Sequence, residues 1–168
     1  MRKIHLIANW KANPKELSDA KRLALGFKGG LMKARFTDVA LAVPHPFLFS
    51  VGEVLGKSER CRIAAQDVSP VNEGAHTGSV TASMLKSLGV REVIVGHSER
   101  RAQGLTDEGV RIRVEKILKS GLTVVLCVGE RERDTHGAYL KTIESQLLTA
   151  LKNVQKSKSG RLIVAYEP

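Results

Sequence analysis

Aromatic side chains and cysteines are scarce in this sequence of 168 residues. Phe, Trp and Tyr make up only 4% of the chain, which leaves few surfaces on which the bases of single-stranded nucleic acid could stack. The two cysteines, Cys61 and Cys127, lie far apart in or beside apolar runs, and the five histidines show no metal-ligand spacing. We therefore expect two buried, reduced thiols and no metal site.

Long hydrophobic runs are also missing. No apolar stretch approaches the roughly 20 residues that are needed to cross a bilayer. The basic start Met1–Lys3 is followed by an apolar run that breaks at Asn9, which is too short for a signal peptide. These absences favour a cytoplasmic protein without a membrane partner.

Acidic residues are outnumbered, because 27 Lys and Arg stand against 17 Asp and Glu and give a net charge of +10. The basic residues are spread along the chain, which favours a solvated surface over a nucleic-acid interface. A hydrophobic content of 42% and a length of 168 residues suit a single soluble domain, residues 1–168, with a sizeable core.

Six short, strand-like runs alternate with helical patterns. The runs cover residues 4–8, 38–43, 61–65, 92–96, 122–128 and 161–165, and the apolar helical faces cover residues 17–27, 47–55, 80–88, 110–118 and 140–154. Asn13-Pro14 predicts a helix start with proline near the first helical position, and Gly89 and Gly121 predict helix ends. This alternation predicts an α/β protein with a parallel sheet, either an open doubly wound sheet or part of a barrel.

Motifs that bind nucleotide cofactors are missing from the sequence. GxGxxG does not follow the first strand-like run, so dinucleotide binding is not indicated. The segment Gly52–Ser58 resembles a phosphate-binding loop, but it is one residue short, has Val51 in place of the required glycine and follows a helical pattern. We interpret this similarity as chance.

Polar side chains follow three of the strand-like runs, namely Asn9 and Lys11, then His97, then Glu167. The C-terminal ends of parallel strands converge on one edge of a sheet, where such folds bind ligands. Lys11 offers a cation for an anionic substrate, and Glu167 offers a general base. Residues 98–100 favour a short helix, beside which a neutral His97 could donate a hydrogen bond to a carbonyl. This set fits proton abstraction next to a carbonyl group.

Six motifs in this order span the chain. They are Ala-Asn-Trp-Lys at 8–11, Gln-Asp-Val-Ser at 66–69, Gly-Ala-His-Thr-Gly at 74–78, Val-Gly-His-Ser-Glu-Arg-Arg at 95–101, Cys-Val-Gly-Glu at 127–130 and Ala-Tyr-Glu-Pro at 165–168. Through them the sequence resembles the triosephosphate isomerase family. The fourth and sixth motifs are highly specific when they occur together.

The resemblance implies a glycolytic and gluconeogenic aldose–ketose isomerase that interconverts dihydroxyacetone phosphate and glyceraldehyde 3-phosphate through an enediolate, without a cofactor. It implies that Asn9 and Lys11 contact this small phosphorylated triose, that His97 is the electrophile and that Glu167 is the base. It also implies that Glu99 is a buried carboxylate near Lys11 and His97.

The resemblance further implies a homodimer. Residues 66–78 resemble a loop that reaches into a partner subunit, with Thr77 near its tip. Two positions depart from the family pattern, because Ser79 and Leu105 stand where glutamate is common. We expect a weaker dimer contact at Ser79 and the loss of a buried polar partner at Leu105.

Barrels of this family have about 250 residues and eight strands. With about six parallel strands and five helices, the sequence predicts an incomplete (β/α)8 TIM barrel that is truncated after the sixth strand. Without a lid and the phosphate-binding glycines, we expect weak or no turnover by this chain alone. Three explanations stay open: an engineered or fragmentary piece of an isomerase, a natural short variant that oligomerises to cover its edge strands, and a non-catalytic oligomeric or interaction protein derived from the isomerase.

Overall fold

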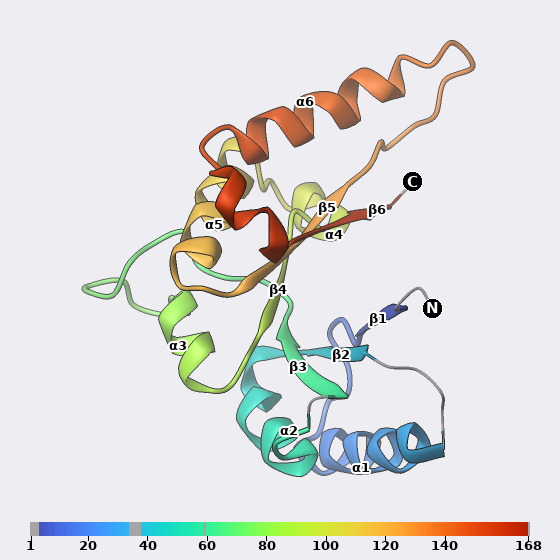
Figure 1. The fold of residues 1–168 in the computed structure, drawn as a ribbon, viewed down its shortest axis with the longest axis vertical. Helices are drawn as coiled ribbons and strands as arrows, with labels where there is room; N and C mark the ends of the chain where they lie inside the picture. The colour runs from blue at the N-terminus through green and yellow to red at the C-terminus, as the bar shows by residue number, and fades with distance from the viewer. Residues whose placement is uncertain (1–3, 34–37, 59, 168) are drawn as a thin grey trace. The chain divides into compact units, whose positions relative to one another are not determined.

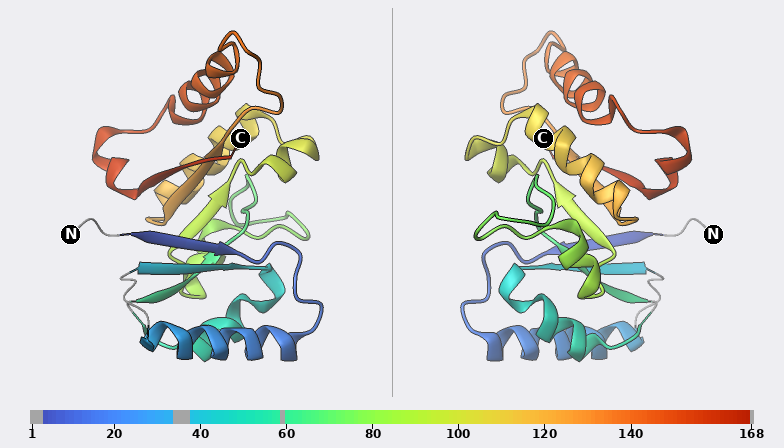
Figure 2. Two further views of the ribbon diagram at one scale, coloured as in Figure 1. Left: turned by 90° about the vertical axis from the view of Figure 1, so that its right-hand side faces the viewer. Right: turned by 90° about the vertical axis from the view of Figure 1, so that its left-hand side faces the viewer.

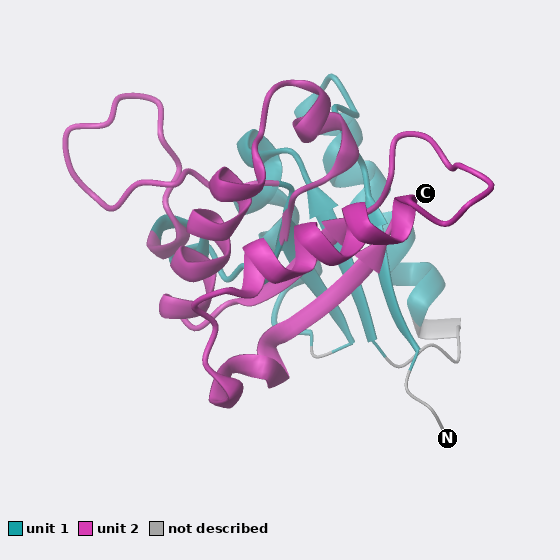
Figure 3. Ribbon diagram, turned by 90° about the horizontal axis from the view of Figure 1, so that it is seen from above, with its two compact units in different colours: residues 1–66, 84–93 teal, residues 67–83, 94–168 magenta. Residues whose placement is uncertain are grey.

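The computed structural model describes residues 4–33, 38–58 and 60–167. The basic start at residues 1–3 and Pro168 of the last motif lie outside the described residues. The chain divides into two compact units (Figure 3). Unit 1 comprises Met1–Gln66 and Met84–Val93, and unit 2 comprises Asp67–Ser83 and Ile94–Pro168.

Parallel strands alternate with helices along the described chain, as the sequence predicts (Figure 1). The strands are β1 (His5–Asn9), β2 (Asp38–Val43), β3 (Cys61–Ala65), β4 (Glu92–Val95), β5 (Thr123–Val128) and β6 (Leu162–Tyr166). Their order in the sheet follows their order in the chain. A doubly wound sheet reverses its strand order at a switch point, so the incomplete (β/α)8 barrel is the alternative that the structure confirms.

The helices fall where the apolar patterns predict them. They are α1 (Leu17–Lys33), α2 (Leu48–Leu55), α3 (Ala82–Ser87), α4 (Ser98–Ala102), α5 (Asp107–Lys119) and α6 (Tyr139–Leu151), with 3-10 turns η1 (His45–Phe47) and η2 (Lys156–Arg161). The predicted helix ends are confirmed, because Gly89 and Gly121 take the left-handed conformation with φ of 83° and 78°. The predicted start at Asn13-Pro14 is wrong. The first turn of α1 instead begins at Glu16, whose carbonyl accepts from the amide of Ala20 at 3.1 Å.

Unit 1 buries its core between a strand and two helices. In β2, every residue from Val39 to Val43 is buried. Helices α1 and α2 pack on each other and cover one face of the strands of this unit (Figure 2). Ala20 and Ala24 of α1 and Val51 of α2 are fully buried, because small side chains allow close approach of the helices.

Four ionisable side chains gather where the strands of unit 1 begin. His5 of β1 lies 3.0 Å from Asp38 of β2 and 3.0 Å from Glu92 of β4. Arg62 of β3 contacts the same two carboxylates, at 2.5 and 2.8 Å. Glu92 is buried, and such a carboxylate is tolerated only with partners.

Unit 2 is built around β5, α5 and α6. Residues 124–128 of β5 are buried, and α5 packs on both β5 and α6. The hydroxyl of Thr106 caps α5 by accepting from the amide of Gly109 at 3.1 Å. Cys61 of unit 1 and Cys127 of unit 2 are buried and unpaired, as predicted. Within the described residues, every helix is too short or too polar to span a bilayer.

Candidate active site

His97 lies between β4 and α4 and caps that helix. Its Nδ1 accepts a hydrogen bond from the amide of Glu99 at 3.2 Å. Gly96 makes this turn possible, because its φ is 78° and an added Cβ would lie 2.9 Å from the carbonyl oxygen of Cys127. A ring nitrogen that accepts carries no proton, so the proton of the neutral imidazole lies on Nε2.

Glu167 follows β6 and meets His97. Its Oε1 lies 3.3 Å from His97 Nε2, and its Oε2 accepts from the amide of Ser98 at 3.2 Å. The main-chain amide of Glu167 donates to the carbonyl of Val128 at 2.9 Å, which fixes its position beyond the end of β5. Two of the residues that the sequence singles out, far apart in the chain, are therefore in contact within unit 2.

Gly129 and Gln146 support Glu167 and were missed by reasoning from the sequence. A Cβ added at Gly129 would lie 1.8 Å from the carbonyl oxygen of Glu167, so only glycine permits this approach. Gln146 of α6 is buried, donates to the carbonyl of Gly129 at 2.9 Å and accepts from its amide at 3.0 Å. The signals in the sequence were the place of Gly129 in the motif at 127–130 and a glutamine within the apolar pattern of a predicted helix.

Cys127 is a second neighbour of Glu167. Burial, together with the negative charge and hydrogen bonding of Glu167, raises the pKa of the Cys127 thiol to about 12. The sequence identified this cysteine only as a buried thiol. The structure adds that it stays protonated beside the carboxylate of Glu167.

A hydrogen-bonded cluster lies beside the tip of β6. The hydroxyl of Tyr166 donates to both carboxylate oxygens of Glu130, at 2.8 and 2.9 Å, and Arg133 donates to the same carboxylate at 2.8 Å. Burial raises the pKa of Glu130, but the hydrogen bonds from Arg133 and Tyr166 outweigh it and hold that pKa below its ordinary value. This cluster fixes the residue that precedes Glu167.

Glu99 does not have the predicted burial. Its side chain is 54% exposed, and its Oε2 lies 3.6 Å from Nδ1 of His97. The reason is that α4 is only one short turn, whose residues Ser98 to Arg100 are all exposed. Proximity to His97 is thus found, whereas burial of the carboxylate is not.

Asn9 and Lys11 form a tight turn at the end of β1 in unit 1. Asn9 Oδ1 accepts from the amide of Lys11 at 3.0 Å. Lys11 has a φ of 54°, a conformation that costs a non-glycine residue on the order of 1 kcal/mol. Gln66 stabilises it by donating from Nε2 to Asn9 Oδ1 at 3.2 Å and to the carbonyl of Lys11 at 2.8 Å. Strain held by such bonds is common at functional sites.

Thr77 is exposed in the segment between β3 and α3, which has neither helix nor strand (Figure 1). The base of this loop is closed by Ser69, whose amide donates to the carbonyl of Val80 at 2.8 Å and whose hydroxyl accepts from the amide of Val80 at 2.9 Å. The loop is therefore tied at its base and presents its tip to solvent.

A groove of about 540 Å³ in unit 2 is lined by Ser98, Glu167, Arg101 and Leu105, among others. Arg101 donates from Nε to the carbonyl of Gly96 at 2.7 Å, but its buried Nη2 has no hydrogen-bond partner in the described part of the chain. Leu105 lines the same groove, and the loss of a buried polar partner at this position stays a prediction. No three His, Cys, Asp or Glu side chains gather as metal ligands among the described residues.

These features define a class of protein: an incomplete (β/α)8 barrel with a histidine–glutamate pair beyond its strand ends. The family model described as triosephosphate isomerase matches residues 4–168. The chain therefore belongs to the triosephosphate isomerase family, whose members are isomerases.

Relatives agree with this assignment. Triosephosphate isomerase of Paracidovorax citrulli is 40% identical over 172 residues, covering 100% of this chain and 68% of that protein. That of Trichodesmium erythraeum is 41% identical, covering 100% of this chain and 69% of that protein. The crystal structure of triosephosphate isomerase from Bartonella henselae superposes with a TM-score of 0.83 at 30% identity, covering 99% of this chain and 68% of that one.

Proposed function

We propose that this chain carries the proton-transfer groups for the interconversion of dihydroxyacetone phosphate and glyceraldehyde 3-phosphate. The observation that supports this is the contact between His97 Nε2 and Glu167 Oε1 at 3.3 Å, with the tautomer of His97 set by the amide of Glu99. A hydrogen-bond donor and a carboxylate base side by side are what an enediolate reaction requires.

The reaction needs no change of oxidation state in the protein and no cofactor. The carboxylate of Glu167 takes the proton from the carbon next to the carbonyl group and returns it to the neighbouring carbon. The Nε2–H of His97 donates to the carbonyl oxygen as negative charge develops on it. That oxygen takes up a proton and the neighbouring hydroxyl oxygen gives one up through His97, so that the carbonyl and hydroxyl groups exchange places. Asn9 and Lys11 contact the substrate, whose phosphate is attracted by the ammonium group of Lys11. Glu99 contributes a carboxylate beside the imidazole.

The assembly and location belong to the same proposal. We propose that residues 1–168 act as one domain and that the loop carrying Thr77 reaches a second copy, giving a homodimer. Its tied base and exposed tip support this role. A cytoplasmic place in glycolysis and gluconeogenesis is expected from the family.

We further propose that a polypeptide of these 168 residues, made by itself, turns over slowly. It spans about two thirds of its relatives, at 68% of the Paracidovorax citrulli protein. The groove beside Glu167 is open, and an open site keeps water near the reacting atoms and loses commitment of the substrate.

A coupled isomerase assay on protein from a host that lacks its own isomerase tests both proposals. Glu167→Gln keeps the shape of the side chain and removes the base, so we expect a rate loss of roughly 100-fold or more. Glu132→Gln is the matched control, because Glu132 lines the same groove and has no proposed role. Equal rates in all three proteins contradict the catalytic proposal, and a near-normal rate for the unchanged chain contradicts slow turnover.

A second function, as an oligomeric or interaction protein, is favoured by an apolar groove of about 550 Å³ in unit 1. It is lined mainly by Leu6, Leu23, Phe27 and Leu31. Leu23→Lys is expected to shift the sedimentation coefficient toward the monomer. Leu25→Lys is the control, because Leu25 is exposed but does not line the groove. Identical sedimentation of both variants and the unchanged chain contradicts this function.

A further inference from the structure

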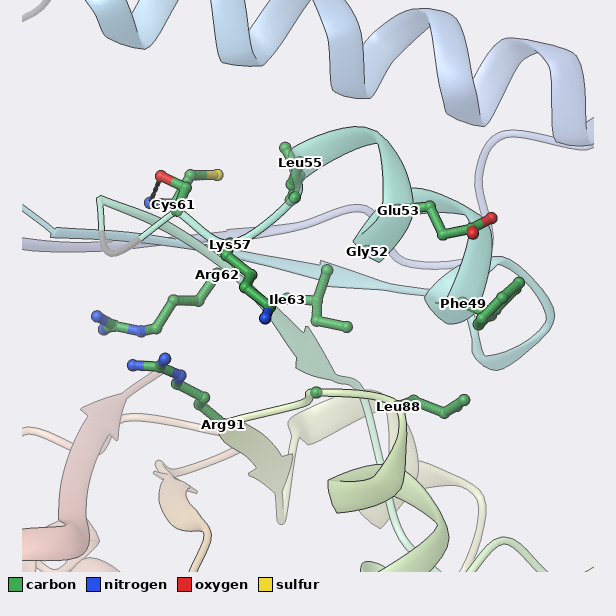
Figure 4. A pocket seen from close by; sticks show the side chains of 13 residues that line it. Phe49, Gly52, Glu53, Leu55, Lys57, Cys61, Arg62, Ile63, Leu88 and Arg91 are labelled. Atoms are coloured by element: carbon green, nitrogen blue, oxygen red, sulfur yellow. Dashed lines mark hydrogen bonds between the residues drawn. The ribbon is translucent and has the colours of Figure 1, made fainter.

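An amphiphilic groove of about 610 Å³ lies in unit 1 where β3 and β4 begin (Figure 4). Its apolar part is formed by Leu55, Ile63 and Leu88. Phe49, which is 59% exposed, lies at one end, and the guanidinium groups of Arg62 and Arg91 lie at the other. The groove therefore combines an apolar part with a cationic end.

Two of the cations in this groove are not neutralised. Among residues 4–33, 38–58 and 60–167, no ion pair or side-chain hydrogen bond involves Lys57 or Arg91. Arg62 differs, because it contacts Asp38 and Glu92 at 2.5 and 2.8 Å. Glu53 also lines the groove, so Lys57 and Arg91 leave it with an excess of positive charge, which attracts an anion.

The segment Gly52–Ser58, which resembles a phosphate-binding loop, borders this groove. It ends α2 instead of starting a helix, so it has no helix N-terminus for a phosphate. Its amides are also in use, since Gly56 donates to the carbonyl of Gly52 at 2.9 Å and Ser58 donates to that of Gly56 at 2.9 Å. What the segment offers an anion is the side chain of Lys57.

We propose that this groove binds a phosphate monoester with a flat aromatic body, of which adenosine monophosphate is a representative. The phosphate lies against Lys57 and Arg91, because guanidinium and ammonium groups are the usual partners of phosphate. The flat body lies over Ile63 and Leu88 toward Phe49. A volume of about 610 Å³ suits a ligand of this size.

The site is separate from the proposed catalytic residues of the same unit. Asn9 and Gln66 lie at or just beyond the C-terminal ends of β1 and β3, whereas Cys61 and Arg91 of the groove lie at the starts of β3 and β4. The proposal therefore does not depend on isomerase activity.

Binding is tested by titrating adenosine monophosphate, inorganic phosphate and adenosine separately into ¹⁵N-labelled protein at low salt. The variant is Lys57→Gln with Arg91→Gln. The matched control is Lys15→Gln with Lys21→Gln, which removes the same charge from exposed positions of unit 1 outside the groove. We expect saturable shifts of groove amides, and affinity for adenosine monophosphate at least tenfold weaker in the first variant and unchanged in the control.

Phe49→Ala separates the two halves of the ligand. We expect this variant to bind adenosine monophosphate several-fold more weakly and to bind inorganic phosphate with unchanged affinity, because only the flat body contacts Phe49. Absence of saturable binding overturns the proposal. Equal weakening by the groove variant and its control also overturns it, because the attraction would then come from net charge alone.

Discussion

Gly129→Ala is the sharpest test of how Glu167 is held. The added Cβ would lie 1.8 Å from the carbonyl oxygen of Glu167, and contacts below 3.0 Å are essentially never found for this atom. The two main chains must therefore separate by at least 1.2 Å, the difference between these distances. Gln146 holds the peptide of Gly129 through two hydrogen bonds, so Glu167 is the side that moves.

The expected loss in free energy of unfolding is about 1–3 kcal/mol, the usual effect of overpacking. It includes about 1 kcal/mol for the hydrogen bond from the amide of Glu167 to Val128. The contacts of the carboxylate with His97 at 3.3 Å and Ser98 at 3.2 Å are lost as well. A base displaced by about 1 Å reacts roughly 100-fold more slowly.

Urea unfolding measures the stability, and the ¹H–¹⁵N shift of the Ser98 amide reports the position of the carboxylate. Gly160→Ala is the control, because nothing lies within 4 Å of a Cβ added there. The reasoning is refuted if Gly129→Ala leaves both the urea midpoint and the Ser98 resonance where they are in the unchanged protein.

Three further outcomes are expected. The pKa of the Cys127 thiol rises from 9.0 to about 12 on folding. The contribution of this thiol to the free energy of unfolding is therefore complete below pH 9. It is lost between pH 9 and 12, at a rate on the order of 1 kcal/mol per pH unit. Urea unfolding of Cys127→Ala across that range should lack this part of the slope. Leu105→Gln should raise the free energy of unfolding by about 1 kcal/mol, because its amide oxygen can accept from the buried Nη2 of Arg101. Arg62→Met should lower it by about 3 kcal/mol, because the buried carboxylate of Glu92 loses a cation.

Each of these outcomes has a result that contradicts it. If the free energy of unfolding of Cys127→Ala falls with pH between 9 and 12 as steeply as that of the unchanged protein, the thiol has the same pKa in the folded and unfolded states. No gain in Leu105→Gln would mean that the unpartnered nitrogen of Arg101 costs little. Arg22→Met is the control for Arg62→Met, because the ion pair of Arg22 with Asp19 is at the surface. Equal losses in these two variants would contradict the importance of burial.

The sequence by itself determined the strands and helices, and it determined which strand ends carry the candidate catalytic side chains. Apolar runs and helical periodicity depend only on residues that are neighbours in the chain. The predicted bounds of the six strands and of the helices therefore lie close to the observed ones. The short helix after His97 and the helix ends at Gly89 and Gly121 follow equally from local preferences.

The tertiary structure decided which side chains meet and how deeply each is buried. The contact of His97 with Glu167, the two hydrogen bonds of Gln146 to Gly129 and the ion pair of Arg62 with Glu92 join residues far apart in the chain. Such pairs leave no periodic signal, because their geometry depends on how strands and helices pack. The exposure of the Glu99 side chain has the same origin, since burial depends on what covers a residue and not on its own chemistry.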